Sequence, residues 1–357
     1  MKSNESEKVG GRSKRSPTAV LAGSSQSTAG GLLLLIAITW FIYGTIGNGF
    51  LSSFNLFTLS QLAAQTAVLG FAQLAVLALG RMNLAVGAVG VCVTMFTAWL
   101  IGVKHVDPLL GIAAGLVLGA ATGALMGWIE LKTKLNSFIV TLAMASVYTG
   151  LMLLLSNGDP VGNIPASIAS FGASSMFTPY LSFLVIPALV VAGGAWFLYR
   201  RTSLGWKMLA VGANETAAGL SGVRVSRVVI IGFGLSGLLC GVAGMMEMAR
   251  VAAALPSQGG TWLLAAFIVP VLGGNSLRGG SVAIGGALLA AIFLESINSG
   301  LVSLDVAVYW RELAQAAVLL VAVMVDEARR RRQRNAKVER MVEAEAARRS
   351  EGAHAYG

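Results

Sequence analysis

The hydrophobic residues of this chain occur in long runs that short polar stretches separate. A helix needs about 20 apolar residues to cross the roughly 30 Å of hydrocarbon in a bilayer. By that rule the pattern predicts ten spans, at residues 31–51, 62–80, 82–102, 109–130, 138–156, 181–199, 228–250, 262–274, 281–299 and 312–326. Eight spans with re-entrant segments are a second interpretation. Residues 54–61, just before the second span, are expected to form a short interfacial helix.

The composition is that of a membrane protein. Of the 357 residues, 55% are hydrophobic and 12% are charged, and the mean hydropathy is +0.74. Soluble domains carry about 25% charged residues. The sequence therefore predicts an all-α polytopic membrane protein.

The basic residues orient these spans. Cytoplasmic loops of membrane proteins carry an excess of Lys and Arg. With the N-terminus inside and ten spans, only Lys104, Arg250 and Arg311 of the 26 basic residues lie outside. An odd number of spans would put one basic tail outside. We therefore predict that both termini are cytoplasmic.

Three regions follow from this topology. Residues 1–30 are expected to be a disordered basic cytoplasmic tail before an uncleaved first span, residues 31–326 the transmembrane domain, and residues 327–357 a second basic cytoplasmic tail. Arg329–Arg332 in that second tail is typical of an anchor to anionic membrane lipids. The net charge of +10 does not indicate nucleic-acid binding, because no aromatic platform accompanies the basic residues.

A regular glycine spacing marks the fourth span. Residues four apart lie on one helix face, and here they form a groove for a neighbouring helix: Gly111, Gly115, Gly119, Gly123 and Gly127. The spacing predicts close helix packing and says nothing about a solute.

Polar side chains within or beside the spans are candidates for a translocation path: Gln65, Gln73, Asn83, Glu247, Glu295 and Asn298. An ionisable residue inside a membrane is a functional hypothesis by default. Alternatively, these side chains form hydrogen bonds between helices, and Glu247 and Glu295 extend toward the membrane–water interface. No catalytic residue and no metal site is predicted, because the chain has two histidines and two separated cysteines.

The loop at residues 200–227 is the longest predicted cytoplasmic loop. Asn214 can cap a short helix with Glu215 in its first turn, and Gly222 can end it. Small and apolar side chains on this helix suit docking into a groove on a partner. A plain connecting helix is the alternative.

At this loop the chain resembles the membrane subunit of bacterial ABC sugar importers, the ribose-type permeases within the branched-chain amino acid and sugar permease superfamily. The matching segments are Arg201-Thr-Ser-Leu-Gly205, Ala210-Val-Gly-Ala-Asn-Glu-Thr-Ala-Ala-Gly-Leu-Ser-Gly222, Leu272-Gly-Gly-Asn-Ser-Leu-Arg-Gly-Gly280, Phe138-Ile-Val-Thr-Leu142, Ser156-Asn-Gly158 and Tyr309-Trp310.

The resemblance implies a bacterial inner-membrane permease that imports a ribose-like or related monosaccharide. It implies a coupling helix that docks on a cytoplasmic ATPase, with Asn214, Glu215, Ala217, Ala218, Ser221 and Gly222 as the coupling residues. ATP and Mg would be bound by that ATPase, since the chain has no Walker A sequence of its own. A periplasmic binding protein and a second permease subunit, as a homodimer, are the other expected partners.

Two segments depart from the family pattern. Where members often carry Gly-Gly-Ile-Asp-Leu-Ser-Val-Gly, this chain has Gly80-Arg-Met-Asn-Leu-Ala-Val-Gly87, so Arg81 replaces a Gly and Asn83 an Asp. Where members often have Tyr-Glu-Leu-Asp, this chain has Thr261-Trp-Leu-Leu264. Because these segments differ, the substrate class of the family is implied less directly for this chain.

Two other classes of function are weighed against an importer. An ion-gradient-driven secondary transporter of a small polar solute needs ionisable residues near mid-membrane, and only Glu247 and Glu295 are candidates. A membrane enzyme needs clustered acids, histidines or a metal motif at one face, and the long outer loop at 157–180 has one acid and no histidine.

Overall fold

The structure is a computed structural model that describes residues 17–321, 323–324 and 327. In chain order its elements are α1 (Pro17–Ile46), α2 (Ser53–Leu77), α3 (Val86–Ala98), the π-helical turn η1 (Trp99–Val103), α4 (Pro108–Thr133), α5 (Ser137–Ser156), α6 (Ala166–Ala173), α7 (Val185–Arg201), α8 (Ser203–Ala213), α9 (Glu215–Leu220), α10 (Val225–Val251), α11 (Trp262–Leu272) and α12 (Ile284–Ser303). Residues 308–321 are also helical. The described part of the chain is all-α, as the sequence predicts, with two isolated β-bridges and no strand.

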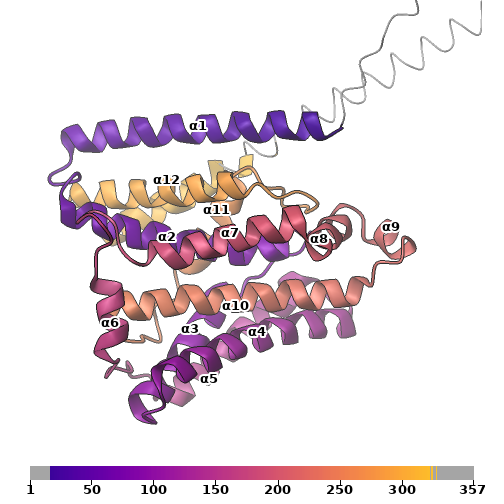
Figure 1. Ribbon diagram of the computed structural model, residues 1–357, viewed down its shortest axis with the longest axis horizontal. Coiled ribbons are helices and arrows are strands. Elements are labelled where there is room, and N and C mark those ends of the chain that lie inside the picture. The colour runs from indigo at the N-terminus through magenta and orange to yellow at the C-terminus, as the bar shows by residue number, and fades with distance from the viewer. Residues whose placement is uncertain (1–16, 322, 325–326, 328–357) are drawn as a thin grey trace, which may run out of the picture.

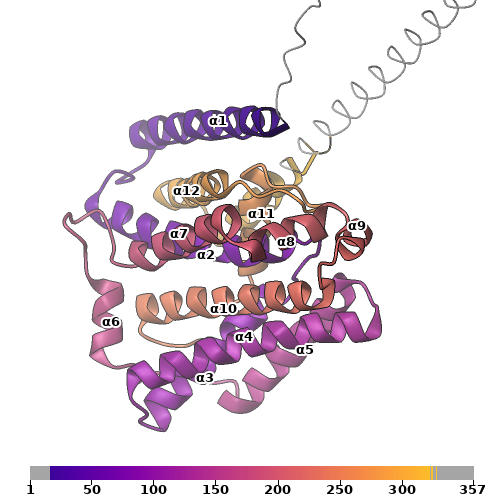
Figure 2. The same cartoon turned by 45° about the vertical axis from the view of Figure 1, so that its right-hand side comes forward.

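The helices stack in layers around α2 and α10 (Figures 1 and 2). At one edge α1 packs on α12, which packs on α2. On its other sides α2 contacts α7, α11 and α10. At the opposite edge α10 packs on α4 and α3, and α5 packs on α3. In its apolar window α2 is 89% buried, whereas α1 is only 6% buried, so α2 is central and α1 peripheral.

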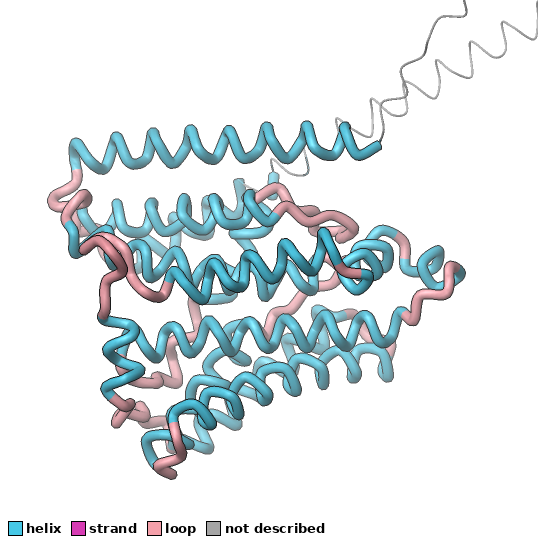
Figure 3. Tube along the Cα trace, in the orientation of Figure 1, coloured by secondary structure: helices cyan, strands magenta, loops and turns pink. Residues whose placement is uncertain are grey.

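The short helices lie at the two ends of this stack. Figure 1 shows α6 at one end and α8 and α9 at the other, and the tube in Figure 3 shows loops joining the helices at both ends. We call these the α6 end and the α9 end. The predicted outer loop contains α6 and the predicted inner loop contains α8 and α9, so the two loops lie at opposite ends of the bundle.

Within the described residues, seven helices are long and apolar enough to cross a membrane: α1, α2, α3 together with η1, α4, α5, α10 and α12. The three remaining predicted spans coincide with shorter helices, namely α7 with 17 residues, α11 with 11 residues, and the helix at 308–321. Residues 322 and 325–326 of the tenth predicted span lie outside the described residues. The count of ten spans therefore stays a prediction.

Two local expectations are wrong. Residues 54–61 do not form a separate interfacial helix but begin α2, which runs unbroken from a cap at Ser52. Residues 17–30 are helical rather than disordered, because α1 starts at Pro17 and extending an existing helix is far easier than nucleating one. The other predicted tail residues, 1–16 and 328–357, lie outside the described residues.

The α11 segment crosses the bundle with only a short helix. At 1.5 Å per residue, 11 residues cover about 16 Å, roughly half of the hydrocarbon thickness. Before α11, Ala254 forms a β-bridge with Val161 at the α6 end. After α11, the Gly280 amide donates to the Ala78 carbonyl oxygen over 3.1 Å at the α9 end. Irregular backbone completes the crossing, which is tolerated where protein surrounds it.

The glycine face of α4 lies against neighbouring elements at every predicted position: Gly111, Gly115, Gly119, Gly123 and Gly127. A Cβ at Gly123 would overlap the Phe233 carbonyl oxygen of α10, and a Cβ at Gly119 would come within 2.7 Å of the Gly237 carbonyl oxygen. The backbones of α4 and α10 thus approach closely, as small residues permit in membrane helices.

Candidate functional site

The short helix α9 occupies the position predicted for a coupling helix. Its N-cap is Asn214, whose side chain accepts a hydrogen bond of 2.9 Å from the Ala217 amide. Glu215 lies in the first turn, near the positive end of the helix dipole. Ser221 is the C-cap, and Gly222 follows with a φ of +80°, a conformation that glycine adopts without strain. These local signals explain why the sequence forms a helix here.

One face of α9 is exposed and the other is seated on the bundle. Glu215, Ala217 and Ser221 are exposed, and the Leu220 side chain is 87% exposed. Ala218 is buried in a small apolar cluster with Ala78, Leu79, Tyr199, Met208, Val211 and Val228. Ala218 therefore holds α9 on the bundle, and its role as a coupling residue stays a prediction.

A charged network links α9 to two other elements. Arg81, in the segment between α2 and α3, pairs with Glu130 near the end of α4. The same guanidinium lies 3.2 Å from the Glu215 carboxylate. The Arg81 and Glu130 side chains are 13% and 8% exposed, whereas Glu215 is 53% exposed. The network therefore has a buried half and an exposed half.

The loop between α11 and α12 lies against the end of α8, the helix before α9. Asn275 is buried and joins the two sides of this loop, because its amide donates to the Pro270 carbonyl over 3.0 Å and accepts from the Ala283 amide over 2.5 Å. Farther along the loop, Gly280 packs against Ala213 at the end of α8. Movement of α9 would therefore reach the segment after α2 through Glu215 and Arg81, α4 through Arg81 and Glu130, and the loop after α11 through Ala213 of α8.

Four of the six predicted path residues are buried or part-buried at helix contacts and do not line the cavity described below. Asn83 accepts from the Ala85 amide and donates to Ser236, which turns the chain into α3. Glu247 pairs with Arg250 one turn later. Gln65 has a long bond of 3.4 Å to the Ala243 carbonyl. Gln73 is fully buried and finds no hydrogen-bond partner within the described part of the chain.

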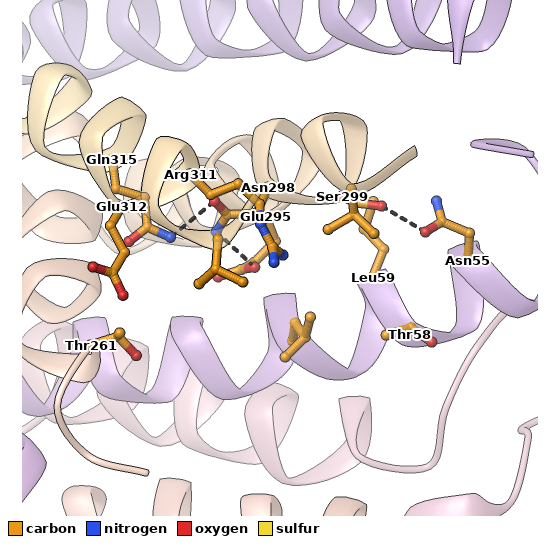
Figure 4. A pocket seen from close by; sticks show the side chains of 13 residues that line it. Asn55, Thr58, Leu59, Thr261, Glu295, Asn298, Ser299, Arg311, Glu312 and Gln315 are labelled. Atoms are coloured by element: carbon orange, nitrogen blue, oxygen red, sulfur yellow. Dashed lines mark hydrogen bonds between the residues drawn. The ribbon is translucent and has the colours of Figure 1, made fainter. Parts of the chain in front are cut away.

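The other two, Glu295 and Asn298, line a cavity of about 240 Å³ at the α6 end (Figure 4). Its polar lining comes from α2, α12, the helix at 308–321 and the residue before α11: Asn55, Thr58, Thr261, Glu295, Asn298, Ser299, Arg311, Glu312 and Gln315. Leu59, Leu62, Val302 and Val308 supply apolar surface. The structure thus brings together the start of α2, the residue before α11, and the end of α12 with the helix that follows it.

A chain of hydrogen bonds fixes the polar wall of this cavity. Thr66 donates to Glu295 over 2.7 Å, and Asn298 donates to the other carboxylate oxygen over 3.2 Å. Gln315 in turn donates to Asn298 over 2.9 Å. The wall is therefore held in one arrangement by α2, α12 and the helix at 308–321.

Several of these residues were not identified from the sequence. Arg81 was noted only as a departure from the family pattern, and Glu130, Asn275 and Arg311 were not singled out as site residues. A buried asparagine or a charged residue at a span end gives a weak signal without its partner. Among the described residues, no group of three or more His, Cys, Asp or Glu could hold a metal ion.

Comparisons with known proteins agree with the sequence motifs. The family model for the branched-chain amino acid transport system / permease component matches residues 52–323. The chain is 35% identical to a ribose import permease protein of Escherichia coli, over 83% of this chain and 91% of that protein. It is 36% identical to an L-arabinose ABC transporter permease protein of Azospirillum brasilense, over 74% and 77% of the two chains. It is 29% identical to a xylose transport system permease protein of Escherichia coli, over 84% and 91%.

Proposed function

Because this chain belongs to the branched-chain amino acid transport system / permease component family, as a ribose-type sugar ABC permease, we propose that it carries a monosaccharide into the cytoplasm. It is a transport subunit and not an enzyme. In this proposal a separate ATPase binds ATP and Mg and supplies the energy. A binding protein delivers the solute on the other side of the membrane.

The observation that carries the proposal is that α9 is attached to the transmembrane helices on one face and exposed on the other. This helix projects at one end of the bundle with Leu220 exposed, while Ala218 and the ion pair of Glu215 fix it to the transmembrane helices (Figure 1). An ATPase that gripped the exposed face would move α4, the segment after α2 and the loop after α11. Its differential contact with α9 in two nucleotide states would bias access to the path.

This proposal assigns the two ends of the bundle. The α9 end faces the cytoplasm, together with both termini, and the α6 end faces the periplasm across the bacterial inner membrane. The basic residues around α8 and α9 then lie beside anionic lipid headgroups. A second copy of this chain completes the path as a homodimer.

The alternative of an ion-gradient-driven transporter loses its support. Family membership places the chain among ABC permeases. Glu247, one of its two candidate acids, is already neutralised by Arg250 at 2.6 Å.

The coupling role can be tested on Leu220. We expect Leu220→Glu to prevent co-purification with the ATPase of the same transport system and to abolish ATP-dependent sugar uptake into proteoliposomes. Leu51→Glu, a half-exposed leucine in the loop between α1 and α2, is the matched control and should leave the complex intact. Normal assembly and uptake with Leu220→Glu would overturn the coupling assignment.

A further inference from the structure

The cavity at the α6 end has the dimensions and chemistry of a binding site. Its volume of about 240 Å³ lies just below the range of pockets for drug-sized ligands, so it suits a small solute. Glu295 and Ser299 are buried at its base, whereas Thr261 and Glu312 are exposed at its rim. A solute could therefore enter from the rim and lie against a fixed polar wall.

The lining selects for a neutral molecule that is rich in hydroxyl groups. Amides and hydroxyls in the wall offer both donors and acceptors, as each sugar hydroxyl requires. Leu59 and Leu62 offer an apolar surface for the C–H face of a sugar ring. Arg311 also lines the cavity, and its guanidinium brings N–H donors to this wall.

The charges in the lining exclude the two simplest alternatives. Two acids, Glu295 and Glu312, and one base, Arg311, face the cavity, which disfavours an anionic ligand such as a sugar phosphate. A metal cation is disfavoured because, among the described residues, no group of three or more His, Cys, Asp or Glu could hold one. The Arg311 guanidinium would also repel a cation.

We propose that this cavity is a binding site for a neutral monosaccharide within the permease, formed by Glu295, Asn298, Gln315 and Arg311. The site rests on the proposed function for its class of solute. It adds that the permease itself recognises the sugar, in addition to any selection by a binding protein. The Glu295 carboxylate accepts hydrogen bonds from sugar hydroxyl groups at the base of the site. The hydrogen bond that Gln315 donates to Asn298 fixes the Asn298 side chain beside it.

Protection of an introduced cysteine tests the site. Thr58 lines the cavity and its hydroxyl bonds only the Phe54 carbonyl one turn earlier, so Thr58→Cys places a thiol there with little disturbance. The native Cys92 and Cys240 are buried and give a low background. With the full chain in nanodiscs, we expect D-ribose, L-arabinose or D-xylose at millimolar concentration to slow labelling by a charged methanethiosulfonate reagent several-fold.

Matched variants make the result specific. Thr45→Cys on α1 is the control thiol, because its hydroxyl also bonds only its own helix and it lies outside the cavity, and sugar should not protect it. Glu295→Gln in the Thr58→Cys chain should raise the half-protecting sugar concentration about tenfold. Asp159→Asn removes an exposed carboxylate outside the cavity and should leave that concentration unchanged.

Three outcomes would overturn the site: no protection by any of the three pentoses, equal protection at Thr45→Cys, or protection by ribose 5-phosphate or Ca²⁺ in place of neutral sugar. The measurement uses neither the ATPase nor the binding protein. A chain that assembles with its ATPase and imports sugar, yet shows no protection, would refute the site alone. Protection without ATPase assembly would refute only the coupling proposal.

Discussion

The guanidinium of Arg81 lies 3.2 Å from the carboxylate of Glu215, so an ion pair joins the segment before α3 to the exposed helix α9. The same guanidinium pairs with Glu130 of α4 inside the bundle. Arg81 therefore connects the surface helix α9 to α4 and to the segment before α3. Asn83 lies two residues after Arg81, and its side chain accepts from the Ala85 amide where the backbone turns into α3.

The two acids of this network should differ in their effect on stability. Removing one partner of a buried ion pair leaves an uncompensated charge and costs roughly 3 kcal/mol. Losing an exposed pair costs less than about 1 kcal/mol. We therefore expect Glu130→Gln to lower the thermal unfolding midpoint of the purified protein by several degrees and Glu215→Gln to shift it little. Equal shifts of the unfolding midpoint in the two variants would show that the buried Arg81–Glu130 pair does not contribute more to stability than the exposed Arg81–Glu215 pair.

Glu215→Gln should nevertheless impair coupled transport. The variant keeps the fold and the exposed face of α9, but α9 loses its ion pair to the segment that leads into α3. We expect several-fold fewer sugar molecules imported per ATP hydrolysed, with assembly unchanged. Arg224→Gln removes a charge at the same end that makes no ion pair among the described residues, and it serves as the control. An unchanged ratio in Glu215→Gln would exclude a role for this pair in coupling.

The glycine contact between α4 and α10 should be intolerant of a methyl group. At Gly123 an added Cβ would meet the Phe233 carbonyl oxygen, and overpacking of this kind costs typically 1–3 kcal/mol. Gly193→Ala on α7 is the matched control, because nothing lies within 4 Å of its Cβ position. We expect a lower unfolding temperature for Gly123→Ala only, measured by a thermal shift assay in detergent. A neutral Gly123→Ala would mean that the two helices can separate without loss.

Asn275 should contribute more to stability than an ordinary helix-capping asparagine. Its side chain makes three hydrogen bonds, to Pro270 and Ala283, and each is worth about 1 kcal/mol. Asn136 accepts one capping bond, from the Phe138 amide, worth about 1 kcal/mol, and a long bond of 3.4 Å from the Ser137 hydroxyl. Thermal unfolding should therefore rank Asn275→Ala as more damaging than Asn136→Ala, and the reverse order would contradict the bridging role of Asn275.

Much of the fold was predictable because its signals are local. Long apolar runs located the helices, although α1 and α2 begin 14 and nine residues before the predicted spans. The glycine spacing in α4 identified the face that packs closely on its neighbours, α10 among them. The capped helix at Asn214 was also predictable, since its cap, first turn and glycine stop all lie within nine residues of one another.

The contacts between distant segments were not predictable from one sequence. Arg81 is separated from Glu130 by 49 residues and from Glu215 by 134. The cavity combines α2 with α12 and the helix that follows it, and no periodicity within any one of them indicates the others. The burial of Ala218 was also not predictable, because a six-residue helix is too short to show a periodic apolar face.

The short α11 also constrains how the chain enters a membrane during synthesis. An 11-residue apolar helix is too short to be recognised as a span by itself, so it must insert together with a neighbour. The backbone of Gly273 touches that of Gly286, which closes α11 and α12 into a hairpin without any side chain between them. We therefore expect α11 to enter the membrane together with α12, which is long enough to span. A bulky residue at Gly286, where an added Cβ would overlap the Gly273 carbonyl oxygen, should then disturb the insertion of both helices.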